Sequence, residues 1–193
     1  PLKYEAEDMF HIGDTYYVSF HNKSAGGYLY KASITSYTIK YNANGGTGSI
    51  SDSSRNYGIS SALTANSFKN DGWNFGGWTA HRASDNKWLY ADAEGNKADW
   101  YIEGKQPTGY KKYVYANKES CGSQSPVNGD VVTMYAVWTP YSYTIAYNKN
   151  SGTGTMTSTT AYSGEEATLR ANTFTRENYD FMGWTAKRKS DSK

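Results

Sequence analysis

The chain has 193 residues, with 20 lysine and arginine residues against 18 aspartate and glutamate residues, and a mean hydropathy of −0.79. This near balance without a basic stripe argues against a nucleic-acid partner, and no apolar run approaches the roughly 20 residues that span a bilayer. Aromatic residues make up 16% of the chain, with 19 tyrosines, so we expect a core of rings in a polar, turn-rich β structure.

Residues 1–35 carry two short strand patterns, at residues 13–20 and 27–31, joined by a polar turn. We expect this segment to be a linker or the end of an upstream β module. The chain begins at Pro1 and not at methionine, so we expect it to be an internal part of a longer protein. The lack of a signal peptide then excludes nothing.

An internal duplication dominates the rest of the chain. Residues 36–87 align without gaps with residues 142–193, and close to half of the aligned positions are identical. Such self-similarity predicts two copies of one structural unit. The aromatic and glycine anchors that we expect to shape both copies are Tyr37, Tyr41, Gly46, Phe75, Gly77 and Trp78, with Phe181 and Trp184 in the second copy.

The first copy begins with residues 37–42, which alternate rings and an aliphatic residue with polar ones and therefore predict a half-buried strand. Glycines in residues 44–48 predict a tight turn, because glycine adopts positive φ at no steric cost. A second strand, exposed on one face, is expected within residues 49–56, and a short helical turn within residues 60–66.

A further strand is expected at residues 73–79, where Gly77 would let Trp78 approach a neighbouring backbone. Later, residues 125–130 read as a turn. Residues 131–138 follow with the apolar pattern of a buried closing strand, and they carry the anchors Tyr135 and Trp138.

Between these strands lies an insertion at about residues 81–120, rich in rings. Exposed rings stack on sugars or pack on a protein partner, which makes the insertion the candidate contact surface. The competing interpretation, which we favour, is a small satellite core, because a polar insertion of this length needs packing of its own. The candidate ligand-contact residues are Trp88, Tyr90, Trp100 and Tyr101.

No residue set in the chain predicts catalysis, a metal site or a cofactor. The three histidines lack metal-ligand spacing, and the glycine-rich run after Asn44 lacks the lysine of a phosphate loop. Oxygen-bearing residues at 92–99 suggest calcium, but a hairpin turn around Gly95 is favoured because the loop is too short. Cys121, the single cysteine, forms no intrachain disulfide, and we expect it to be a tolerated loop thiol.

Several motifs in order resemble the Listeria/Bacteroides repeat, also called the internalin B-repeat. The chain shows Tyr-Asn-Ala-Asn-Gly-Gly-Thr-Gly from Tyr41, Gly-Trp-Asn-Phe-Gly-Gly-Trp from Gly72, and Gly-Asp at Gly129 leading to Tyr-Ala-Val-Trp from Tyr135. It departs from the family pattern in Thr64 where proline is usual, in Ser151 where glycine is usual, and in the long insertion.

The resemblance implies small β-grasp-like repeat domains, mainly β with one short helix, displayed in tandem on bacterial surface proteins. We therefore expect residues 36–140 to form a complete repeat and residues 141–193 a second, truncated repeat without its closing strand. The expected function is a non-catalytic, monomeric spacer at the cell envelope that contacts host or cell-wall glycan or protein. The alternative is a carbohydrate-binding accessory module of a secreted enzyme.

Overall fold

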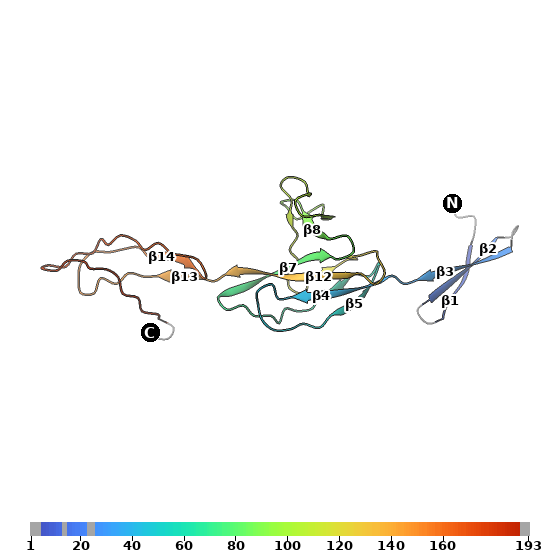
Figure 1. Ribbon diagram of the computed structural model, residues 1–193, viewed down its shortest axis with the longest axis horizontal. Coiled ribbons are helices and arrows are strands. Elements are labelled where there is room, and N and C mark those ends of the chain that lie inside the picture. The colour runs from blue at the N-terminus through green and yellow to red at the C-terminus, as the bar shows by residue number, and fades with distance from the viewer. Residues whose placement is uncertain (1–4, 13–14, 23–25, 190–193) are drawn as a thin grey trace. The chain divides into compact units, whose positions relative to one another are not determined.

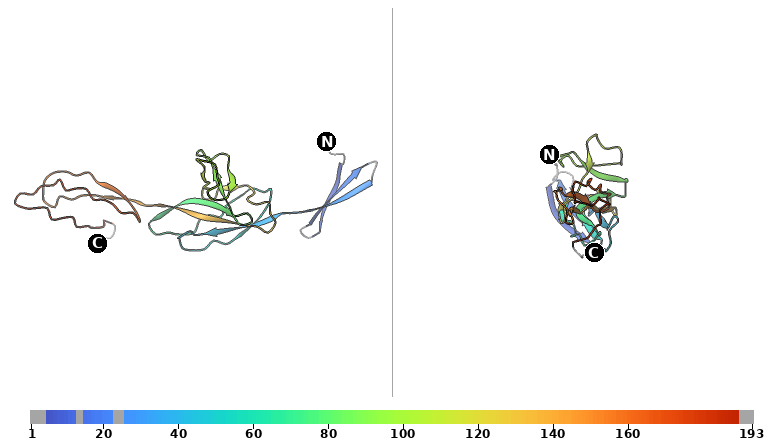
Figure 2. Two further views of the ribbon diagram at one scale, coloured as in Figure 1. Left: turned by 45° about the horizontal axis from the view of Figure 1, so that its top comes forward. Right: turned by 90° about the vertical axis from the view of Figure 1, so that its left-hand side faces the viewer.

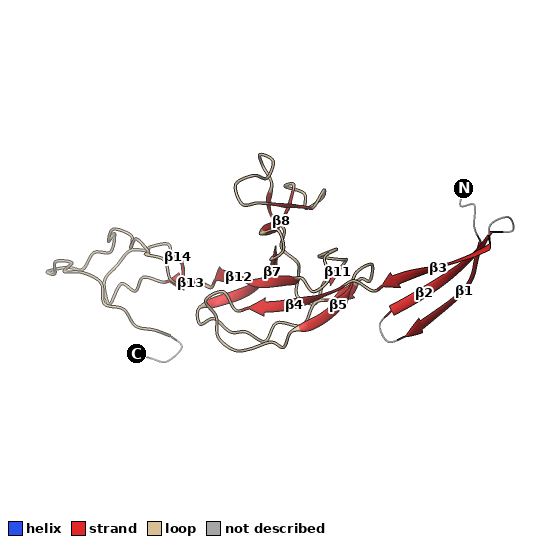
Figure 3. Cartoon of the chain, turned by 45° about the vertical axis from the view of Figure 1, so that its right-hand side comes forward, coloured by secondary structure: helices blue, strands red, loops and turns tan. Residues whose placement is uncertain are grey.

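The computed structural model describes residues 5–12, 15–22 and 26–189 of the chain (Figure 1). All regular elements in this part of the chain are strands, drawn in red in Figure 3, which confirms the mainly β fold class. Within the same residues, no helix has the length and apolar character needed to cross a bilayer. The chain divides into two compact units, Pro1–Thr139 and Pro140–Lys193.

The first three strands form an antiparallel sheet of their own, in the order β1-β2-β3. They are β1 (Glu5–Ile12), β2 (Thr15–Asn22) and β3 (Gly26–Ser33). The sequence predicted β2 and β3 but not β1, whose register is interrupted by a bulge between Ala6 and Asp8. Gly13 and Asp14, at the start of the first expected strand, and residues 23–25, in the expected turn, lie outside the described residues.

The first repeat forms a mixed sheet in which the predicted closing strand lies at the centre. Its strands β4 (Ser36–Asn42), β5 (Ser53–Asn56), β7 (Trp73–Arg82) and β12 (Val131–Pro140) are arranged in the order β7-β12-β4-β5 (Figure 1). β12 runs parallel to β4, and β5 runs antiparallel to it. Because alternate residues of β12 are buried, this strand contributes one full face to the core.

The insertion extends this sheet beyond β7. Its strands are β8 (Lys87–Ala91), β9 (Asp99–Tyr101) and β10 (Lys111–Lys112), with β8 next to β7 and both β9 and β10 paired with β8. In Figures 1 and 2 the loops of this segment, coloured yellow-green, stand away from the rest of the sheet. The insertion is therefore a continuation of the repeat's sheet whose far end projects outward.

The core is built around Trp78, which is fully buried together with Ile39, Val132 and Met134. Three rings meet the Trp78 ring edge-on: Tyr41 at 5.0 Å, Phe75 at 4.7 Å and Phe68 at 5.9 Å between centroids. Trp138 packs against the same cluster through Phe75, at 5.7 Å. The core is therefore built largely from aromatic rings, as the composition predicted.

Gly77 allows this packing, as the sequence predicted. A Cβ at this position would lie 2.4 Å from the backbone oxygen of Tyr115, and the φ angle of +134° is one that L side chains rarely adopt. The next residue, Trp78, exchanges two backbone hydrogen bonds with Tyr115, each of 2.8 Å. Only glycine brings the two backbones this close.

The prediction of a helical turn at residues 60–66 is wrong. Short strand β6 (Ser61–Ala62) instead pairs with β11 (Ser120–Cys121), and the Leu63 N–H donates to the Glu119 carbonyl over 2.9 Å. The backbone groups here are satisfied by a distant segment, so no helical hydrogen bonds form. The same pairing buries Cys121 in the core rather than leaving it in a loop.

The β-grasp-like arrangement implied by the resemblance stays a prediction. The sheet is mixed, but the short helix of that arrangement is not found among the described residues. In the second unit, β13 (Ser142–Ile145) pairs antiparallel with β14 (Thr159–Tyr162), at the positions that correspond to β4 and β5.

Candidate functional site

The register between β8 and β9 divides the four predicted ligand-contact residues between two faces of the insertion. Trp88 lies opposite Tyr101, and Leu89 lies opposite Trp100. Successive residues of a strand point to opposite faces. Trp88, Tyr90 and Tyr101 therefore share one face, whereas Trp100 lies on the other, packed against the core cluster that contains Leu89.

Trp100 belongs to the packing of the domain. The Arg82 guanidinium lies over its ring, 4.4 Å from the centroid, and the same guanidinium donates to both carboxylate oxygens of Asp85, over 3.0 and 2.7 Å. The hydrogen bond from Arg82, with its charge and that of Lys87, holds the pKa of Asp85 below its usual value against the effect of burial. Trp100 is thus covered by an ordered ion pair.

The opposite face, which we call the outer aromatic face, collects rings from four strands and a loop. It consists of His81, Trp88, Tyr90, Tyr101, Tyr110, Lys112 and Tyr135. Trp88 lies 4.8 Å from His81 and 5.1 Å from Tyr135 between ring centroids. Tyr101 lies 6.3 Å from Tyr90 and 6.1 Å from Tyr110, both edge-on.

These rings differ in accessibility. Tyr90 is only 4% exposed, and the Lys112 ammonium lies over the Trp88 ring, 3.6 Å from its centroid, while bound to Glu103 over 2.8 Å. Tyr101 and Tyr110 are half-buried at the end of the cluster, and Ile102, the residue after Tyr101, is 49% exposed. A partner would reach these last residues first.

The four predicted contact residues do not include Tyr110, which is one of the insertion's rings, and no contact role is predicted from the sequence for His81, Lys112 or Tyr135. From the sequence, His81 is weighed only as a metal ligand and Tyr135 only as an anchor. The alternation within residues 131–138 places Tyr135 opposite the core face of Val132, Met134 and Ala136. The alternating pattern of residues 131–138 could have predicted the outward position of Tyr135. The strand register that brings His81 and Lys112 beside Trp88 is set only by the tertiary structure.

The turn that joins β8 to β9 forms a hairpin, as favoured over a calcium loop. The Asn96 N–H donates to the Asp92 side chain over 2.7 Å, and the Gly95 N–H donates to the Asp92 carbonyl over 3.0 Å. One carboxylate oxygen and the backbone carbonyl of Asp92 are therefore engaged in the turn itself. Among the residues described, no three His, Cys, Asp or Glu side chains are grouped to hold a metal ion.

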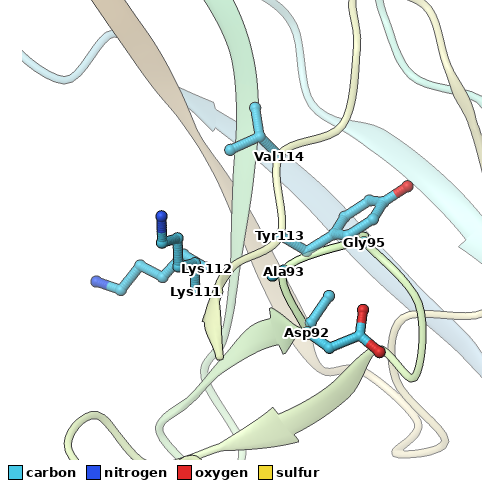
Figure 4. Close-up of a pocket in the computed structure, with 8 residues that line it drawn as sticks. Asp92, Ala93, Gly95, Lys111, Lys112, Tyr113 and Val114 are labelled. Carbon is cyan, nitrogen blue, oxygen red and sulfur yellow. The ribbon is translucent and has the colours of Figure 1, made fainter. Parts of the chain in front are cut away.

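A shallow open pocket of about 210 Å³ lies between this turn and residues 111–114. Figure 4 shows the Lys111 and Lys112 side chains extending on one side and the Asp92 carboxylate on the other. Its walls are otherwise apolar or backbone, from Ala91, Ala93, Gly95, Tyr113 and Val114. Asp92 Oδ1 is engaged in its own turn, and the Lys112 ammonium is bound to Glu103, so both of these charged groups already have partners.

The Listeria-Bacteroides repeat domain pattern matches residues 37–102 and 143–193, which together are more than half of the chain. The chain belongs to the Listeria-Bacteroides repeat domain family. Neither a curated protein nor a solved structure matches it. The family is typical of bacterial surface proteins, and its repeats are of a non-catalytic type.

Both repeats of this family in the chain build the same aromatic cluster. In the second repeat the Trp184 ring lies 4.9 Å from Tyr147, 4.8 Å from Phe181 and 6.1 Å from Phe174. These values match those around Trp78 in the first repeat to within a few tenths of an ångström. The rings of this cluster therefore serve packing in each repeat. The outer aromatic face lies outside the cluster, although the matched segment extends to residue 102 and so includes Trp88, Tyr90 and Tyr101.

Proposed function

We propose that the chain is a non-catalytic, extracellular repeat region of a bacterial surface protein, in which the repeats are monomeric spacers and the insertion makes adhesive contact. The observation that supports this division is the duplicated cluster around Trp78 and Trp184. The same rings appear in both repeats for packing, so a specific contact needs residues outside that shared set. The domains are residues 36–140 and 141–193, preceded by the upstream module of residues 1–35.

The contact residues are Tyr101 and Tyr110, at the end of the outer aromatic face, together with the exposed Ile102, which follows Tyr101 in the chain. Tyrosine brings a large ring and a polar hydroxyl at low entropic cost, which suits protein interfaces. Trp88 is not a contact residue in this proposal, because the Lys112 ammonium already covers one face of its ring. Sugars bind best to an open ring face, so the arrangement favours a protein partner over a glycan.

The test compares three forms of the full chain on immobilised extracellular-matrix proteins and on a glycan array. The contact variant is Tyr101→Ser with Tyr110→Ser, and the matched control is Tyr57→Ser, which removes a tyrosine that is 54% exposed in the first repeat but outside the insertion. We expect binding to a matrix protein, weakened about tenfold or more in the contact variant and unchanged in the control.

Each other result has a defined meaning. Binding to glycans alone would replace this proposal with the alternative, a carbohydrate-binding accessory module of a secreted enzyme. Equal binding by the contact variant and the native chain, with both folded, would remove the insertion as the contact site. Binding to neither array would leave the spacer role and contradict adhesion.

A further inference from the structure

The outer aromatic face contains one positive charge that is held in a fixed place. The Lys112 ammonium lies over the Trp88 ring, 3.6 Å from its centroid. The Trp88 ring is itself packed against His81, at 4.8 Å, and against Tyr135, at 5.1 Å between centroids. A cation over an indole face is attracted by the ring, more strongly where water is partly excluded. Because the Lys112 side chain is only 31% exposed, its ammonium is a pre-positioned binding group.

The carboxylate bound to this ammonium comes from an exposed turn. Glu103 binds Lys112 over 2.8 Å, but its own side chain is 65% exposed. The backbone of the turn is held separately, by a 2.9 Å hydrogen bond from the Lys105 N–H to the Ile102 carbonyl. Ion pairs exposed to this degree contribute little to stability. The Glu103 side chain can therefore leave Lys112 without any change in the backbone of its turn.

Apolar surface lies next to this ion pair. Tyr101 is opposite Trp88 in the pairing of β9 with β8, and its ring lies 6.1 Å from that of Tyr110. Ile102 follows Tyr101 and is 49% exposed. A partner group that reaches the ammonium over Trp88 thus finds two half-buried rings and an exposed aliphatic side chain nearby.

The segment that carries these groups is positively charged. Residues 101–112 contain three lysines, one glutamate and no other charged residue, which gives a net charge of +2, equal to that of the whole chain. Among the described residues, Lys105 and Lys111 form no ion pair. A local excess of positive charge attracts negatively charged surfaces and repels positively charged ones. The charge therefore favours an acidic partner.

We propose that the outer aromatic face binds an acidic segment of a protein partner, whose carboxylate replaces that of Glu103 on the Lys112 ammonium. An apolar side chain next to that carboxylate packs on Tyr101, Ile102 and Tyr110. Glu103 is then an internal competitor, which neutralises Lys112 until an acidic partner displaces it. This inference rests on the proposed adhesive role of the insertion and adds the chemistry of the partner.

An acidic polysaccharide also offers carboxylates, but the rings around Lys112 fit it less well. Sugars stack on an open aromatic face, and here Tyr101 meets both Tyr90 and Tyr110 edge-on. The Trp88 ring has one face covered by the Lys112 ammonium. Side chains of a protein, which vary in shape, pack on such ring edges more readily than flat sugar rings do. The arrangement therefore favours an acidic protein segment.

The experiment titrates a blocked acidic peptide, acetyl-Gly-Glu-Phe-Glu-Phe-Glu-Gly-amide, into the isotope-labelled full chain and follows the amide NMR signals. We expect saturable shifts at Tyr101, Ile102 and Lys112, and about tenfold weaker binding of the same peptide with glutamine in place of glutamate. Lys112→Met should weaken binding of the acidic peptide about tenfold. Its matched control is Lys69→Met, which removes an exposed lysine of the first repeat outside the insertion and should bind as the native chain does.

The decisive variant is Glu103→Gln, because a folding defect weakens binding and does not strengthen it. Removal of the competing carboxylate should strengthen binding of the acidic peptide roughly threefold. Its matched control is Glu94→Gln, which removes an exposed carboxylate from the turn between β8 and β9 and should leave the affinity unchanged.

Four results would overturn the proposal. They are unchanged or weaker binding by Glu103→Gln, an equal gain in Glu94→Gln, equal binding of the glutamine peptide, and no binding of the acidic peptide. Tighter binding of hyaluronate oligosaccharides than of the peptide would also overturn it and would assign the site to an acidic polysaccharide.

Failure of this proposal differs from failure of the adhesive role. If matrix-protein binding still depends on Tyr101 and Tyr110 while the peptide results fail, adhesion stands and the acidic partner is wrong. If the chain binds neither a matrix protein nor the peptide, the adhesive role is itself contradicted.

Discussion

Gly77 lies against the backbone of Tyr115 so closely that a methyl group on its Cα would come within 2.4 Å of the Tyr115 oxygen. Its counterpart in the second repeat, Gly183, has a similar φ angle of +147°, but a methyl group there would meet no atom within 4 Å. The two glycines thus share one backbone conformation and differ only in what lies beside them. Substituting alanine at each glycine therefore measures backbone strain alone at residue 183, and backbone strain together with steric clash at residue 77.

Gly77→Ala should destabilise the first repeat by about 3 kcal/mol or more, because strain at positive φ adds to a clash with rigid backbone. Gly183→Ala should cost only the strain, about 1 kcal/mol. Chemical denaturation of the two variants measures the difference. Equal losses would show that the approach of Tyr115 contributes nothing.

Trp78→Ala should cost roughly 3–5 kcal/mol, since a fully buried indole leaves a large cavity. Such a loss approaches the whole stability of a small domain. The matched variant Trp184→Ala removes a half-buried ring from the same cluster, and its effect should be smaller. Thermal melts of both variants check this order, and the reverse order would contradict it.

Asp130 should make the first repeat acid-sensitive. Burial acts to raise the pKa of its carboxyl, but hydrogen bonds from Ser125, from the side chain and backbone of Ser84, and from the Val131 N–H outweigh it, so the pKa is lowered. A lowered folded-state pKa gives stability that is full above the unfolded value of about 4 and is lost as the pH falls through the folded value.

Asp130→Asn should therefore destabilise the repeat at pH 7 by about 2 kcal/mol and flatten its stability profile below about pH 4. Denaturation midpoints between neutral and acid pH give the two curves. If the midpoints of the native chain and of the variant fell in parallel as the pH is lowered, the acid sensitivity would belong to other carboxylates.

Cys121 should resist thiol reagents while the chain is folded. Burial, the largest influence, raises the pKa of its thiol, and the side chain is 3% exposed, so both thiolate formation and access are suppressed. Labelling with a disulfide reagent at mildly alkaline pH should follow the rate of unfolding, and labelling in denaturant should be immediate. Fast labelling under native conditions would contradict the burial of β11.

Residues 36–140 should fold when expressed alone, whereas residues 141–193 should not. The first fragment carries β12 and the buried residues that it covers, and the second leaves Tyr143 and Phe181 each 49% exposed. Amide exchange on the two fragments measures this. Strong protection in the second fragment would show that the repeat boundary is misplaced.

The sequence alone identified the duplication, the strands around Tyr37, Trp78 and Val132, and the need for glycine at position 77. These features are local: period-two patterns and glycine-rich turns carry their meaning within a few residues. The family assignment rests on the same local anchors, in the order in which they occur.

Tertiary structure decided which rings of the insertion face outward. Trp100 and Tyr101 are neighbours in the chain, yet the pairing of β9 with β8 sends one to the core and the other to the outer aromatic face. A shift of one residue in that pairing would exchange them, and nothing in the composition of the insertion fixes it. The strand at Ser61 and the burial of Cys121 depend in the same way on a partner about 60 residues distant. Local propensity cannot specify a hydrogen-bond partner so far along the chain.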